Sequence, residues 1–176
     1  MVTQATAPDR RDTGESTMKH VLAAAIFLAA ALCAGRAGAF TFADGTTTHC
    51  IARGEVAMEI YAEPTDPFKP QNRTALAERT PNGWQITWNV ERLKGLPPEV
   101  RDFLFFHECA HIRVPTEVEL TANCAGLKDM RAAGRAGSAF EARLRQFFPP
   151  DNEYWNETFR CADGEPQAPP APAPAG

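Results

Sequence analysis

Hydrophobic and polar residues alternate along the first half of the chain, a pattern typical of half-buried β-strands. The stretch Val56–Tyr61 shows this alternation and predicts one strand. Further on, Thr74–Arg79 and Trp84–Val90 flank the turn signal Pro81-Asn82-Gly83, so together they predict a β-hairpin. The apolar residues that share one face of the second arm are Trp84, Ile86, Trp88 and Val90.

Apolar residues recur at helical spacing along the second half of the chain. Pro97-Pro98 is expected to begin a helix, because proline is tolerated in a first turn, and Arg113-Val114-Pro115-Thr116 is expected to end it. A second helix is predicted from about Glu117 to Ala133 and a third from about Ser138 to Phe147. A small antiparallel sheet followed by helices predicts an α+β fold.

The start of the chain resembles an export signal. Met18-Lys19-His20 precedes the apolar run Val21–Ala34, which is followed by Ala37-Gly38-Ala39. A charged start, an apolar region of this length and an A-x-A site are the parts of a secretory signal peptide. The apolar run is too short for a stable membrane span. We therefore expect an exported protein, periplasmic or secreted, with residues 1–39 as upstream extension and signal peptide.

The rest of the chain is expected to form one domain over residues 40–165. The Pro/Ala-rich segment 166–176 cannot build a core, and we expect it to be a disordered tail. About 125 residues are enough for a single hydrophobic core. The formal net charge is −4, and the chain has no basic run interleaved with aromatic residues, so nothing in it suggests nucleic-acid binding. The oligomeric state is left open.

The first predicted helix carries an H-E-x-x-H motif, His107-Glu108-Cys109-Ala110-His111. Residues four apart on a helix lie one above the other, so His107 and His111 can offer two imidazole nitrogens to one Zn²⁺ ion. Glu108 points off that line, where it can take a proton from a water molecule on the metal. Two buried core histidines are the alternative interpretation. The motif favours a zinc site with Glu108 as the catalytic residue.

A third ligand has to come from a later segment. The metzincin pattern places Gly at position 114 and His at position 117, where this chain has Val114 and Glu117. The next predicted helix offers Glu119 and, one turn later, Asn123. With these residues, the stretch from Phe103 to Met130 resembles the gluzincin zinc metallopeptidases, in particular their M48-like minimal domains with H-E-x-x-H followed by E-x-x-A-D.

The resemblance implies a minimal zincin-like fold and a role for each matching residue. Glu119 takes the position of the third zinc ligand. Asn123 stands where the family has an aspartate that orients a zinc-binding histidine from behind, and an uncharged amide supports the histidine less than a carboxylate does. Two alternatives stay open: Glu117 as the ligand, and a capping box in which Glu119 folds back toward Thr116.

Four cysteines remain after residues 1–39, at positions 50, 109, 124 and 161. An even number in an exported chain predicts two disulfides, with three connectivities open. Cys109 lies on the histidine helix and Cys124 follows Asn123 on the next helix. We expect a Cys109–Cys124 bridge that clamps these two helices, which leaves Cys50 to pair with Cys161.

These features predict an exported zinc-dependent metalloprotease that hydrolyses peptide bonds in a peptide or protein substrate. In zincins an edge strand pairs with the extended substrate, and Trp84–Val90 is our candidate, with an ordinary core strand as the alternative. Tyr154 and Arg160 are candidates for stabilising the oxyanion, because no histidine follows His111. Two other interpretations are a zinc-stabilised envelope binding module with little or no activity, and a disulfide-stapled domain without metal.

Overall fold

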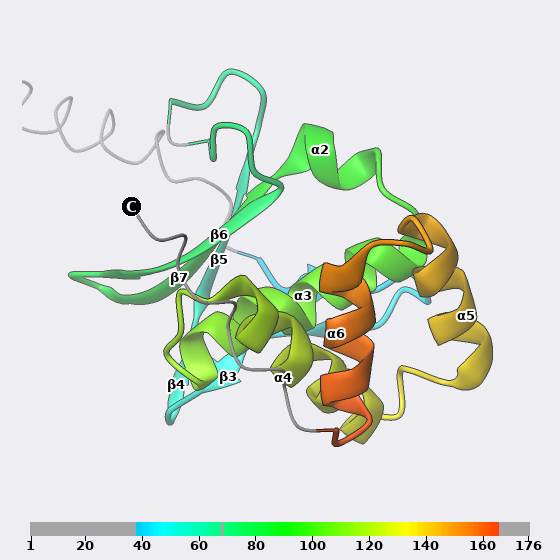
Figure 1. The fold of residues 1–176 in the computed structure, drawn as a ribbon. Helices are drawn as coiled ribbons and strands as arrows, with labels where there is room; N and C mark the ends of the chain where they lie inside the picture. Colours follow the sequence, from blue (N-terminus) through cyan, green and yellow to red (C-terminus); the bar gives the residue numbers. More distant parts are fainter. Residues whose placement is uncertain (1–37, 68, 166–176) are drawn as a thin grey trace, which may run out of the picture. The chain divides into compact units, whose positions relative to one another are not determined.

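The computed structural model describes residues 38–67 and 69–165, all of which belong to one compact unit of the chain. Most of the predicted leader and the whole 166–176 tail lie outside these residues. The described part is a mixed α+β domain with its strands first and its helices second, as predicted (Figure 1). No helix in this part is long and apolar enough to cross a membrane.

Within residues 38–67 and 69–165, seven strands form three small sheets. β1 and β2 pair antiparallel, β3 and β4 form a short hairpin, and the main sheet has the order β5-β7-β6. In that sheet β7 runs antiparallel to β6 but parallel to β5, so the sheet is mixed, and the predicted antiparallel sheet is wrong in this respect. The strand bounds are β1 Phe40–Thr41, β2 Thr47–Thr48, β3 Ile51–Ala52, β4 Glu55–Val56, β5 Met58–Ala62, β6 Ala75–Thr80 and β7 Gly83–Asn89.

The β6–β7 hairpin forms where the turn signal predicts it. Thr80 pairs with Gly83 across the two-residue loop Pro81-Asn82, and the Thr80 hydroxyl donates to the Gly83 carbonyl over 3.0 Å. Gly83 has φ +120°, a conformation that a residue with a side chain rarely adopts. The alternation along β7 then turns Ile86 and Trp88 into the core, where both are fully buried.

The helices are α2 Val90–Lys94, α3 Pro98–Arg113, α4 Glu119–Ala132, α5 Ser138–Phe147 and α6 Glu153–Ala162. Of the helices in the described residues, the sequence predicted α3, α4 and α5 but not α2 and α6. α2 begins after Asn89, whose side chain accepts from the backbone N–H of Arg92, so the last residue of the predicted strand is helical. Asn152 caps α6 in the same way by accepting from Trp155.

α3 lies between two hydrophobic clusters. Phe105 and Ile112 pack with the sheet residues Ile86 and Trp88, whereas another face of α3 packs against the later helices. The members of that second cluster are Val100, Phe103, Leu127, Met130, Leu144 and Phe159. Because both clusters include residues of α3, this helix joins the sheet side of the domain to its helical side (Figure 1).

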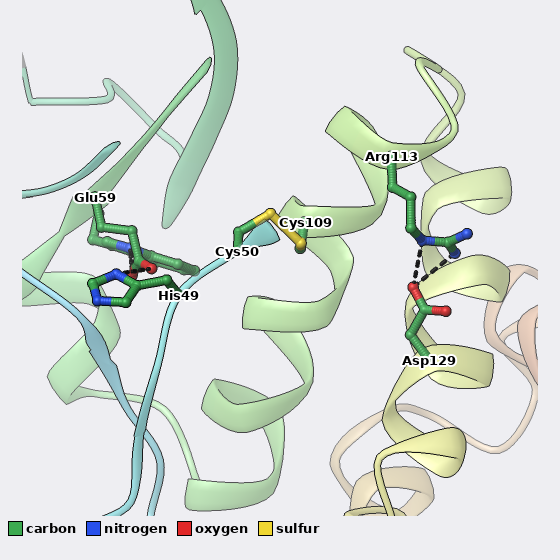
Figure 2. The surroundings of a disulfide bond; sticks show 7 residues. His49, Cys50, Glu59, Cys109, Arg113 and Asp129 are labelled. Atoms are coloured by element: carbon green, nitrogen blue, oxygen red, sulfur yellow. Dashed lines mark hydrogen bonds and ion pairs between the residues drawn. A yellow bond between two sulfur atoms is a disulfide. The ribbon is translucent and has the colours of Figure 1, made fainter. Parts of the chain in front are cut away.

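The cysteine pairing differs from the prediction. Cys50 is bonded to Cys109, and Cys124 is bonded to Cys161, so the expected Cys109–Cys124 and Cys50–Cys161 pairs are wrong. Cys109 is two positions after His107, about 200° around the helix, where it faces the segment before β3 and not α4. Figure 2 shows this bridge beside α3, while Arg113 reaches across to Asp129 of α4 with its Nε at 2.8 Å. The disulfides therefore tie α3 to the sheet side and α4 to α6.

Glu59 of β5 is a buried carboxyl group beside the first disulfide (Figure 2). The Trp88 indole N–H donates to its Oε2 over 3.3 Å, and the half-exposed His49 has its Nδ1 3.9 Å from Oε1. Oε1 itself has no hydrogen-bond partner among the described residues. Burial raises the pKa of Glu59 to about 7, and the hydrogen bond from the Trp88 indole only partly offsets this.

The raised pKa of Glu59 predicts a fold that loses stability as the pH rises. The protonated carboxyl favours the folded state at and below the unfolded-state pKa, and this contribution is lost as the pH passes about 7. Glu59→Gln mimics the protonated form. We expect it to match wild type near pH 4 and to be more stable by roughly 2 kcal/mol near pH 9.

Urea unfolding at several pH values measures this difference. Glu63→Gln is the matched control, because Glu63 is exposed directly after the same strand, and it should follow wild type throughout. A Glu59→Gln variant that is equally destabilised at both ends of the pH range would contradict the explanation.

Candidate metal centre

The two motif histidines meet at the surface of α3. His107 is buried and His111 is partly buried, and their Nε2 atoms lie 3.1 Å apart. The Nδ1 of His111 lies 2.7 Å from the carbonyl oxygen of Thr116, in the loop after α3. A carbonyl oxygen only accepts, so Nδ1 carries the hydrogen and Nε2 is left with a free lone pair.

Glu119 brings a carboxylate to the same point. It is the first residue of α4, and its Oε2 lies 3.2 Å from His107 Nε2 and 3.5 Å from His111 Nε2. The hydrogen bond with His107 is the largest cause that lowers the pKa of Glu119, to about 2. Together the three side chains form a group that could hold a metal ion.

The structure differs from the two alternatives predicted for this segment, which were a capping box at Glu119 and Glu117 as the metal ligand. In the capping box, Glu119 would fold back over the helix start, but its carboxylate faces the histidines and the Thr116 hydroxyl accepts from the backbone N–H of Val118. Glu117 lines the same cleft but is outside the three-residue group. α4 also begins two residues later than expected, at Glu119.

The position of Glu119 depends on a close crossing of α3 and α4 at Gly126. A Cβ atom placed on Gly126 would lie 2.9 Å from the backbone nitrogen of His107 and 2.9 Å from the carbonyl carbon of Phe106. Neither atom can move without shifting α3, since both belong to its backbone. Only glycine fits at this crossing, two helical turns after Glu119.

Glu108 lies beside the histidines in the same cleft and is almost fully buried. Burial is the largest influence on its carboxyl group and raises its pKa, while His107 and His111 act in the opposite direction. The backbone N–H of Ala77 on β6 donates a hydrogen bond to this carboxyl group. The structure therefore brings Glu108 next to the three possible ligands, with a fixed backbone donor behind it.

Asn123 is buried one turn after Glu119, but its hydrogen bond goes to a residue that the motif does not include. Its Nδ2 donates to the hydroxyl oxygen of Tyr154 on α6 over 2.8 Å. The Nδ1 of His107, which the family's aspartate would hold, is buried without a hydrogen-bond partner among the described residues. Arg160, the other candidate on α6, is paired with Glu153 and Glu157.

Tyr154 is under the electrostatic influence of the site. Burial raises the pKa of its hydroxyl to about 12, the negative charge of Glu119 adds to this, and the hydrogen bond with Asn123 opposes it. The phenol therefore stays protonated at neutral pH. No spacing rule in the sequence could have found this pair, because 31 residues separate Asn123 and Tyr154.

The site opens into a cleft of about 900 Å³. One wall is formed by β6 and the residues before it, and the other by α3 and the start of α4. The strand nominated from the sequence, Trp84–Val90, is wrong for the edge position, because β7 lies in the middle of the sheet between β5 and β6. β6 is the edge strand that borders the cleft.

Comparisons of the chain with known protein families, with curated proteins and with solved structures found no match. The chemistry of the site is therefore inferred from its residues alone.

The crossing at Gly126 predicts the effect of a single methyl group. Gly126→Ala should force α4 away from α3, destabilise the fold by about 2 kcal/mol and weaken metal binding, since Glu119 moves with α4. Thermal unfolding and zinc titration against a chromophoric chelator measure the two effects.

Gly137→Ala is the matched control. Gly137 precedes α5 with φ −81°, and a Cβ there would meet no atom within 4 Å. Because Gly137 is the N-cap of α5, this change should cost less than about 1 kcal/mol of stability, and it should leave metal binding unchanged. If Gly126→Ala binds metal as tightly as Gly137→Ala, the crossing does not position Glu119.

Proposed function

We propose that this chain is an exported zinc metallopeptidase of the gluzincin type that hydrolyses peptide bonds in a peptide or protein substrate. The observation that carries the proposal is the convergence of His107, His111 and Glu119, with the carboxyl group of Glu108 beside them in one cleft. A site that only stabilises the fold does not need a carboxylate in the position of Glu108.

The spacing of the three donor atoms supports zinc as the metal. A tetrahedral ion with bonds of about 2.0–2.2 Å sets its ligand atoms about 3.3–3.6 Å apart. The separations here are 3.1, 3.2 and 3.5 Å. Two imidazole nitrogens and one carboxylate are also a donor set that Zn²⁺ uses in catalytic sites, where a fourth position stays open. Glu119 is exposed, so solvent can reach its carboxylate.

The orientation of His111 suits this role. Its Nδ1 hydrogen bond to the Thr116 carbonyl keeps the Nε2 lone pair directed toward His107 and Glu119. Without a cation or a proton between them, the two Nε2 atoms and the carboxylate would repel one another. Metal binding would therefore stabilise the fold as well as build the site.

Glu108 is the general base of the proposed reaction. Zinc held by His107, His111 and Glu119 would supply Lewis acidity and would make an attacking water easier to deprotonate. Glu108 takes the proton of that water and afterwards delivers it to the departing amine. Its burial favours this exchange, since a carboxylate that is poorly solvated accepts a proton more readily.

β6 supports the binding of an extended peptide. The N–H of Ala77 points toward α3, since it donates to Glu108, so the backbone groups of Ala77 face away from β7. In an antiparallel pair the neighbouring positions on the same edge, Ala75 and Arg79, face the same way. The backbone groups of Ala75 and Arg79 can pair with a substrate strand in the cleft. The scissile carbonyl would then lie beside His107, His111 and Glu119.

Tyr154 is the proposed donor to the oxyanion. It carries a protonated hydroxyl within the electrostatic reach of Glu119, and about two fifths of the residue is exposed. A hydrogen bond that strengthens as negative charge develops on the carbonyl oxygen accelerates acyl transfer.

The two disulfides fit export to an oxidising compartment. The periplasm and the extracellular space both meet this condition. The alternative function, a zinc-stabilised envelope binding module, has the same site but no turnover. His107 Nδ1 without a partner favours that alternative, because an unsupported histidine is a weaker ligand.

Glu108→Gln separates the two functions. The variant keeps the shape of the side chain but cannot take a proton, so it should bind zinc as wild type does and lower peptide hydrolysis by about 10²-fold or more. Zinc content, thermal unfolding and cleavage of a broad peptide library provide the readouts.

Glu117→Gln is the control, because Glu117 lines the same cleft outside the ligand group. It should cleave at a rate near that of wild type. A zinc-loaded wild type that cleaves nothing in the library would instead establish the binding module.

A further inference from the structure

Asn123 forms a hydrogen bond with Tyr154, whereas the gluzincin resemblance would have it support a zinc-binding histidine. Its amide is buried with 3 % of its surface exposed, and its Nδ2 lies 2.8 Å from the Tyr154 hydroxyl. His107 Nδ1, the atom that the family's aspartate would contact, has no partner among the described residues. The buried amide therefore serves α6 and not the histidine in this structure.

The direction of this hydrogen bond decides what the phenol can do. An amide N–H only donates, so the Tyr154 oxygen is the acceptor. The hydrogen on that oxygen is then not used by Asn123 and remains available for another acceptor. An aspartate at position 123 would have the opposite effect, because a carboxylate accepts and would take the phenol hydrogen for itself.

A second link keeps the two helices in place. Cys124, the residue after Asn123, forms its disulfide with Cys161 near the end of α6. Trp155, the residue after Tyr154, stacks on Phe148 with ring centroids 3.5 Å apart. α6 is thus held near its start by Trp155 and near its end by Cys161, which limits how far Tyr154 can move from Asn123.

We propose that Asn123 is a positioning residue that acts through Tyr154, by occupying the phenol oxygen so that the phenol hydrogen is directed to the oxyanion of the substrate. This role of Asn123 rests on the proposed peptidase function. It also explains why an amide, and not the family's carboxylate, stands at this position.

The test compares Asn123→Asp, Asn123→Ala, Tyr154→Phe and the double variant Asn123→Ala/Tyr154→Phe in the full disulfide-bonded protein. Zinc affinity is measured by chelator competition, and kcat and KM are measured on the best-cleaved peptide of a quenched library. A phosphinic analogue of that peptide, which mimics the tetrahedral intermediate, is titrated by calorimetry. Tyr61→Phe is the control, since the other tyrosine of the chain donates to Ala39 in the strand region.

We expect Tyr154→Phe to lower kcat by about 10²-fold with little change in KM, and Asn123→Ala to lower it by about tenfold. Asn123→Asp should resemble Tyr154→Phe, and the double variant should be no slower than Tyr154→Phe, because both residues act through one hydroxyl. Affinity for the phosphinic peptide should fall in parallel with kcat. Zinc affinity should stay within about threefold of wild type in all variants.

Three results would overturn the proposal. The first is an Asn123→Asp variant that is more active than wild type. The second is an Asn123→Ala variant that loses about tenfold or more in zinc affinity. Either result would show that Asn123 supports His107 and does not act through Tyr154. Additive losses in the double variant would show that the two residues act separately. If Asn123→Ala fails to fold, Asn123→Asp and Tyr154→Phe still decide the matter. An inactive zinc-loaded wild type would overturn the peptidase function and this inference together, whereas an active wild type with unchanged variants would overturn this inference alone.

Discussion

The close crossing of α3 and α4 at Gly126 is the constraint on which the site depends. α3 carries both histidines and Glu108, and α4 carries Glu119, so the three possible ligands come together only while the two helices touch. A residue larger than glycine at position 126 would meet backbone atoms of Phe106 and His107. One small residue thus sets the distance between the two parts of the ligand set.

Disulfides and hydrogen bonds to neighbouring elements keep α3 and α4 in this position. α3 is fixed to the sheet side by the Cys50–Cys109 disulfide and by Asp102, whose carboxylate accepts from the backbone N–H of Ala43. α4 is fixed to α6 by the Cys124–Cys161 disulfide and the Asn123–Tyr154 hydrogen bond. By loop length, each disulfide should contribute about 4 kcal/mol in the chain-entropy model. This frame holds together three donor atoms that would repel one another without a cation or a proton between them.

The sequence predicted the local features of this protein and missed several that depend on tertiary neighbours. Helical periodicity placed His107 and His111 on one face of α3, and the turn signal placed the β6–β7 hairpin. The disulfide pairing was wrong because it depends on which side of α3 each neighbour occupies. β7 was taken as the edge strand because its pattern is the same whether a strand has one partner or two. The hydrogen bond between Asn123 and Tyr154 joins distant segments, and no periodicity reports such a contact.

Metal content is the most direct test of the central claim that His107, His111 and Glu119 form a zinc site. The disulfide-bonded protein is purified without chelators and analysed for bound metals, beside His111→Ala, Glu119→Ala and Glu117→Ala. We predict one zinc ion per chain in wild type and Glu117→Ala, and its loss from the other two variants. Wild type that holds no zinc after equilibration with the ion, or equal zinc in all four proteins, would contradict the account.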